Sequence, residues 1–127
     1  MTEDDKKRLR KDPDGLLSYE YLANNIGECS QTDLQELVDI MRTVDLTGQF
    51  LASAARYLHA IDPEGFDETV RTLVAATIDK DREHKYLPAL LMSLYGEDCL
   101  ERSVQLCASD DNFRRIYKRL YPEPNKL

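Results

Sequence analysis

The sequence predicts an all-α protein: a compact bundle of about six to seven short helices with short loops, built as an orthogonal bundle or as stacked helical hairpins. Three observations support this class. Apolar residues recur at helical spacing along most of the chain, and the alternation typical of β-strands is nearly absent. Glycine and proline interrupt the helical pattern at short intervals. The chain has 127 residues, of which 42% are hydrophobic, which suits one domain with one core.

The first fifteen residues are almost entirely polar. Thr2 precedes three acids and then a run of bases, which is the charge order of a capped helix, but Leu9 is its single apolar residue. We therefore expect residues 1–15 to be a frayed or solvated segment, with a basic binding arm (KKRLRK) as the alternative. Residues 16–122 are expected to form a single helical domain, followed by a C-terminal tail at 123–127.

Periodic segments define the helices in the first half of that domain. Residues 18–27 begin at Ser18 as a cap and stop at Gly27, and residues 33–44 follow the cap Ser30. Residues 46–62 carry small side chains around much of their circumference, which predicts the central helix of the domain. Asp62 and Pro63 suit the N-cap and first position of a new helix, whose apolar stripe continues to residue 79.

The second half is expected to add three shorter helices. Residues 86–96 place Pro88 in the first turn and Gly96 at the end. Residues 97–109 follow, and there Cys107 lies in phase with Leu100 and Val104, as expected of a buried cysteine. Residues 111–121 complete the set and stop at Pro122. A Tyr-Leu pair recurs near residues 21, 57 and 86, which is thin evidence for a helical repeat.

Few residues indicate chemistry. His59 and His84 are not at metal-ligand spacing, and the three cysteines form no close pair, so we expect no metal, no cofactor and no catalytic residues. Cys29 lies beside a helix cap, where a lowered thiol pKa is physically possible. Because the chain shows neither an apolar leader nor a membrane-length apolar run, we expect a cytoplasmic protein with no membrane contact.

Charge is unevenly distributed. Residues 16–79 carry eleven acids against three bases, a net charge of −8, within a chain of net charge −7. The acids of this block fall mainly on polar faces and in loops, and an acidic binding surface is predicted at Glu36, Asp39, Glu64, Asp67 and Glu68. In contrast, the last helix has four bases on one arc: Arg114, Arg115, Lys118 and Arg119. We call these four residues the basic stripe.

Three origins are considered for the basic stripe. The helix dipole favours bases near a C-terminus, the stripe could complement the acidic block within the molecule or in a homo-oligomer, or it could bind an external anion. In each case Phe113, Ile116, Tyr117 and Leu120 are expected to anchor the helix while the four bases face solvent.

The leading functional hypothesis is a non-enzymatic protein-interaction domain that acts through its acidic surface, for example an inhibitor or immunity-type protein for a basic partner. The alternative is a nucleic-acid-binding regulator that uses the basic C-terminal helix, although the net charge makes nucleic acid an unlikely partner. A small enzyme with an unrecognised site, built on residues such as His59, His84 or Cys29, is the second alternative.

Overall fold

The computed structural model describes residues 1–122, and the protein is all-helical over that range, which confirms the prediction of an all-α fold. Eight helices are present within these residues, slightly more than expected. They are α1 (Glu3–Arg10), α2 (Leu16–Asn25), α3 (Gln31–Val44), α4 (Gln49–Ile61), α5 (Asp67–Lys80), α6 (Leu87–Tyr95), α7 (Ser103–Ser109) and α8 (Asp111–Leu120). The predicted tail at 123–127 lies outside the described residues.

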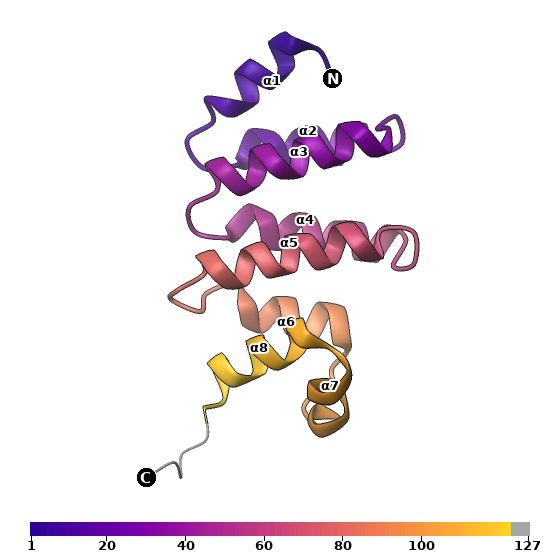
Figure 1. Cartoon of the computed structure of the whole chain (residues 1–127), viewed down its shortest axis with the longest axis vertical. Helices are drawn as coiled ribbons and strands as arrows, with labels where there is room; N and C mark the ends of the chain where they lie inside the picture. Colours follow the sequence, from indigo (N-terminus) through magenta and orange to yellow (C-terminus); the bar gives the residue numbers. More distant parts are fainter. Residues whose placement is uncertain (123–127) are drawn as a thin grey trace.

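The helices lie in layers along the longest axis of the molecule (Figure 1). Helices α2 and α3 form one layer, α4 and α5 the next, and α6 and α8 the third. Contacts between layers run in two columns, one of α1, α3, α5 and α8 and one of α2, α4 and α6. Helix α7 makes its main contacts with α8, so it lies at the end of the molecule.

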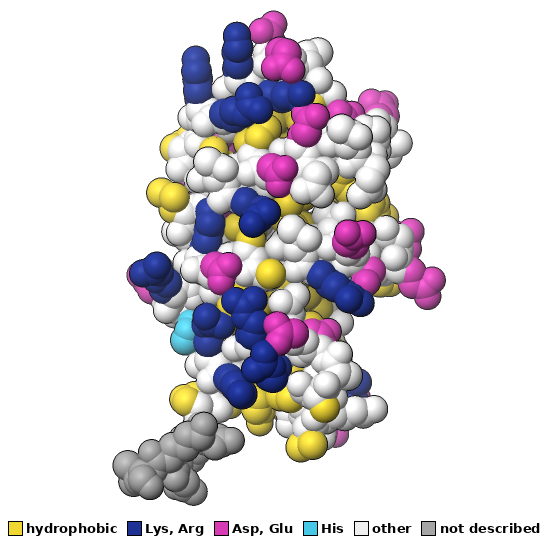
Figure 2. All heavy atoms as spheres, viewed as in Figure 1, with side chains coloured by type: hydrophobic (Ala, Val, Ile, Leu, Met, Phe, Trp, Pro, Cys, Tyr) yellow, Lys and Arg dark blue, Asp and Glu magenta, His cyan; other side chains and the backbone are white. Residues whose placement is uncertain are grey.

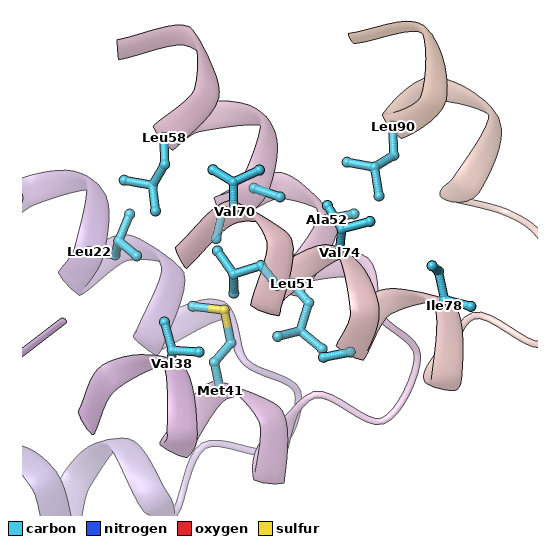
Figure 3. Close-up of a cluster of buried hydrophobic side chains, with 14 of the residues drawn as sticks. Leu22, Val38, Met41, Leu51, Ala52, Leu58, Val70, Val74, Ile78 and Leu90 are labelled. Atoms are coloured by element: carbon cyan, nitrogen blue, oxygen red, sulfur yellow. The ribbon is translucent and has the colours of Figure 1, made fainter. Parts of the chain in front are cut away.

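Helix α4 is central, as predicted. It contacts α2, α3, α5 and α6, and its Ala54 and Ala55 are fully buried, so their small side chains let the neighbouring helices approach closely. Figure 3 shows this part of the core, where Leu51 of α4 meets Met41 of α3 and Val74 of α5. A buried leucine of this kind is worth about 1.5–3 kcal/mol.

A buried aspartate begins each of three loops that lead from one layer to the next. Asp12, Asp45 and Asp81 are nearly inaccessible, and each carboxylate accepts hydrogen bonds from backbone N–H groups at the start of the following helix. Asp45 accepts four, from Thr47, Gly48, Phe50 and Leu51, at 2.8–3.1 Å. These carboxylates satisfy helix N-termini that would otherwise be buried without partners.

The third residue after each of these aspartates has a positive φ. Gly15 has φ 103°, Gly48 has φ 89° and His84 has φ 57°. A Cβ at Gly15 would lie 3.2 Å from the Cβ of Asp45, and one at Gly48 would lie 3.5 Å from that of Asp81, so each loop packs against the next. We call this arrangement the aspartate ladder. Its aspartates are separated by 33 and 36 residues, so the chain contains an internal repeat that the Tyr-Leu pairs do not mark.

The aspartate ladder corrects one predicted helix start. Ser18 is not a cap: α2 begins at Leu16, and Asp12 and Asp14 accept the N–H groups of Leu17 and Leu16. Ser18 is instead buried inside α2. The N-terminus of this helix is capped by upstream residues, Asp12 and Asp14.

The start of α5 also differs from the prediction. Asp62 accepts from the N–H of Gly65 in a turn, and α5 begins only at Asp67. Three other predicted boundary residues are confirmed: Ser30 caps α3, Pro88 lies in the first turn of α6, and Gly96 ends that helix with φ 93°.

Residues 1–15 also differ from the frayed or solvated segment that was expected. Thr2 and Asp5 form a capping box, and Leu9 is buried against the core where α1 contacts α3. Lys6 adds an ion pair with Glu36 of α3 at 2.6 Å. Met1 also packs against the core, and its ammonium pairs with Asp33 of α3 at 3.1 Å.

Candidate functional site

The basic stripe lies on α8 in two groups. Lys118 and Arg119 are exposed, whereas Arg114 and Arg115 are half-buried. Phe113 and Ile116 are fully buried, and Tyr117 and Leu120 pack partly buried against the core, so the apolar arc anchors α8 as predicted. In Figure 2, Lys and Arg side chains gather in the lower half of the molecule, over α8 and its surroundings.

Two of the four bases form ion pairs. Arg115 contacts Asp79 of α5 at 3.0 Å, which is a link within the molecule between the basic stripe and the acidic block. Arg114 pairs with Asp111 in the first turn of its own helix, and this pairing lowers the pKa of the Asp111 carboxyl. Within residues 1–122, Lys118 and Arg119 have no ion-pair partner.

The five acids predicted as a surface lie in two separate places. Glu36 and Asp39 are on α3, where Glu36 pairs with Lys6 and Asp39 pairs with Arg42. Glu64, Asp67 and Glu68 are exposed around the turn between α4 and α5, at one edge of the view in Figure 2. The acids on α3 are therefore interleaved with bases, whereas in the group at the α4–α5 turn only Asp67 is paired, with Arg71.

The face formed by α1, α3, α5 and α8 is one of mixed charge. Shallow hollows between these helices are lined by Lys6, Arg10, Glu36 and Asp39 and, further along, by Arg42, Asp79 and Lys80. The Lys80 ammonium donates to the carbonyls of Arg42 and Asp45 at the C-terminal end of α3, where the helix dipole favours a cation. Burial lowers the pKa of Lys80.

A groove lies between α7 and α8. It encloses about 590 Å³ and is lined by Ser103, Val104 and Cys107 of α7 and by Tyr117, Lys118, Tyr121 and Pro122. Val104 is 87% exposed and Tyr121 is 44% exposed, so neither is covered by any segment within residues 1–122. Singly exposed apolar side chains are common on proteins, but here two of them share one concave surface with a lysine.

The floor of the groove is aromatic. The rings of Tyr117 and Tyr121 lie 5.3 Å apart between centroids, and Tyr117 stacks on the buried Phe113 at 5.8 Å. Tyr95 of α6 meets Phe113 edge to face at 5.0 Å, and burial raises the pKa of its hydroxyl. The aromatic side chains connect the groove to the core through Phe113.

The remaining candidate residues are dispersed. His59 lies at the rim of a shallow depression with Arg56 and Tyr57, whereas His84 occupies a loop of the aspartate ladder. Burial raises the pKa of the Cys29 thiol, and the nearby Asp33 carboxylate raises it further, contrary to the lowered pKa that its place beside a cap allowed. Cys29, Cys99 and Cys107 are free thiols. Residues 1–122 contain no cluster of three or more side chains that could hold a metal ion, and no helix there is long and apolar enough to cross a bilayer.

Sequence reasoning missed the groove because of residues 97–102. This segment was expected to be helical, which put Cys107 in phase with Leu100 and Val104 as a buried cysteine. In the structure it forms turns and α7 begins only at Ser103, so Val104 is exposed and Cys107 is only half-buried. The low content of strong apolar residues in Ser103–Ser109 is the signal in the sequence that would have indicated a weakly packed helix.

Comparison of the chain with protein-family models, with curated proteins and with solved structures gave no match in any of the three.

Proposed function

We propose that this protein is a non-enzymatic protein-interaction module, built as stacked helical hairpins, that binds a partner protein at the end formed by α7 and α8. The observation that carries the proposal is the apolar groove at this end, where Val104 is 87% exposed beside Tyr121 and Lys118. Exposed apolar side chains that share one concave surface are typical of interaction sites.

The opposite end of the molecule supports this choice of surface. The outward face of α1 carries Asp4, Lys7, Arg8 and Lys11, all exposed and all charged. A terminal helix with a polar outer face closes a stack of helical units. The outer face of α1 is thus polar, whereas the end formed by α7 and α8 exposes apolar side chains. An apolar surface of this kind does not aid solubility, so we attribute it to partner binding.

The acidic surface remains a second possible contact for a partner. Its strongest part is the group Glu64, Asp67 and Glu68, in which only Asp67 has an ion-pair partner within residues 1–122, namely Arg71. An inhibitor or immunity-type role toward a basic partner would use this edge. Nucleic-acid binding by α8 is less favoured, because Arg114 and Arg115 already pair with carboxylates.

Site-specific photo-crosslinking tests the proposal. A benzophenone amino acid replaces Val104 in the groove, Glu68 on the acidic surface or Leu46, which is 74% exposed in a loop and serves as the matched control. In native cell extract, we expect the probe at position 104 to capture a discrete protein, and excess unlabelled protein to abolish the capture.

The three positions separate the possible results. Capture at 68 but not at 104 would move the contact to the acidic surface. Capture at none of the three, or equal capture at 46 and 104, would contradict the interaction function at this end. The crosslinking experiment measures protein binding and does not depend on enzymatic activity.

A further inference from the structure

We infer that the groove between α7 and α8 accepts an acidic amphipathic helix of a partner protein. This inference rests on the proposed function and specifies the chemistry of the partner. The groove provides the apolar half of the recognition. Val104 and Cys107 form one wall, and Tyr117 of α8 with Tyr121, the residue that follows the helix, form the other.

The charged half of the recognition comes from the same side of α8. Arg114, Tyr117, Lys118 and Tyr121 are spaced at i, i+3, i+4 and i+7, so they lie on one face of the helix. Lys118 lines the groove, whereas Arg114, one turn before it, is paired with Asp111. A lysine beside an apolar groove matches a helix that carries an apolar stripe flanked by carboxylates.

The two bases of this edge differ in their pairing. Asp111 neutralises Arg114, and Asp98 is paired with Arg102 in the segment before α7. Lys118 is left without an ion-pair partner within residues 1–122. A carboxylate of the partner would therefore meet an unpaired ammonium, whereas a basic helix would meet like charge.

A second copy of this chain fits the groove less well. A symmetric dimer through this end would bring two copies of the same surface together, each with an unpaired Lys118, because a two-fold interface uses the same patch on both subunits. Stacking of copies end to end would bring the groove against the outer face of α1, which offers only charged side chains. The occupant we infer is for these reasons a different protein.

The test uses the full chain and three fluorescein-labelled synthetic peptides. The first is a helical peptide with leucine and phenylalanine on one stripe and glutamate beside it. The second has every glutamate replaced by lysine, and the third has the composition of the first in scrambled order. Fluorescence anisotropy titrations give each dissociation constant. We expect the acidic helix to bind at least about tenfold more tightly than either of the other two.

Protein variants place the binding in the groove. We expect Val104→Asp to weaken binding of the acidic peptide by about tenfold or more, and Lys118→Glu to weaken it by about threefold to tenfold while improving binding of the lysine peptide. The matched controls are Leu46→Asp, which alters an exposed apolar residue elsewhere, and Arg119→Glu, which alters an exposed base of α8 that does not line the groove. Both controls should bind like the unaltered protein.

Several results would overturn the inference. These are equal binding of the three peptides, tighter binding of the lysine peptide, or unchanged binding by Val104→Asp. Sedimentation that shows a dimer lost in Val104→Asp would identify a second copy as the occupant. Tight peptide binding only after removal of residues 123–127 would identify that segment of the chain. If none of the peptides binds but crosslinking at position 104 still captures a protein, the proposed interaction function is retained. Only the inference that the partner offers an acidic helix is then wrong.

Discussion

The two ends of this molecule present different surfaces to solvent. At the N-terminal end, α1 buries Leu9 and turns a wholly charged face to solvent. At the C-terminal end, α8 buries Phe113 and Ile116 just as firmly, yet the groove it forms with α7 leaves Val104 and Tyr121 open. Anchoring to the core is thus similar at the two ends, and the difference lies in the outward surfaces, which is where a partner would bind.

The largest expected effect concerns the anchor of α8. Ile116→Ala should lower the free energy of unfolding by about 2–5 kcal/mol, because Ile116 is fully buried. Leu120→Ala should cost less, since Leu120 is only partly buried. Urea denaturation followed by circular dichroism measures both values.

Reversal of charge on the same helix provides the contrast. Replacement of Arg115 and Arg119 by glutamate breaks only the Arg115–Asp79 pair, and an exposed ion pair contributes about 0–1 kcal/mol. A loss as large as that of Ile116→Ala would show that the basic stripe is a structural clamp.

At the N-terminal end, Leu9→Ala should lower the free energy of unfolding by about 2–3 kcal/mol, near the lower limit for such truncations, because a terminal helix adjusts more easily than a central one. Thermal unfolding monitored by circular dichroism would detect this loss, with the exposed Lys7→Ala as the matched control. No measurable change would mean that α1 is frayed after all, and the closed end would no longer contrast with the open one.

Substitutions of the aspartates in the loops beside the terminal helices are expected to lower the free energy of unfolding by less. Asp12→Ala removes the acceptor for the N–H groups of Asp14 and Leu17 and should cost about 1–3 kcal/mol. Asp110→Ala, at the start of α8, removes the cap for Phe113 and a carboxylate beside the Tyr95 hydroxyl, and should cost about 0.5–2 kcal/mol. Equal losses measured by chemical denaturation would argue against a special role for the buried aspartate.

The smallest effect on stability is expected in the groove. Val104→Ser should change the free energy of unfolding by no more than about 0.5 kcal/mol, because this side chain is largely in solvent. The same variant should bind less of the dye ANS than the unaltered protein does. A clear loss of stability would instead indicate that Val104 belongs to the core.

The sequence predicted the elements whose packing is local and periodic. The apolar stripes of α3 and α8 and the small residues of α4 are direct consequences of helical geometry, so they could be placed without coordinates. The start of α2 could not, because its cap comes from Asp12, five residues before Leu17. The recurrence of aspartate with glycine three residues later, at 12 and 45, was present in the sequence, but the histidine at 84 hid the third member.

The candidate site was predicted only in part. The identity of the basic stripe and its apolar anchors followed from one helix considered alone. Which bases pair with Asp79 or Asp111, and which remain open, depends on how α5 and α8 meet. Burial of Val104 depended on whether residues 97–102 continue the helix of α7, and helix boundaries are decided by tertiary packing as much as by propensity.

The aspartate ladder has a consequence for local unfolding. It couples the loops at Asp12, Asp45 and Asp81 to one another, and within residues 1–122 it has no further member beyond α6. Helices α7 and α8 are therefore joined to the rest by side-chain packing and by exposed contacts such as the Arg115–Asp79 pair, and a region of that kind opens on its own at a lower free energy than the whole. Amide protons of α7 should exchange with solvent first and those of α4 last. The end that carries the groove can therefore change its conformation to fit a bound partner.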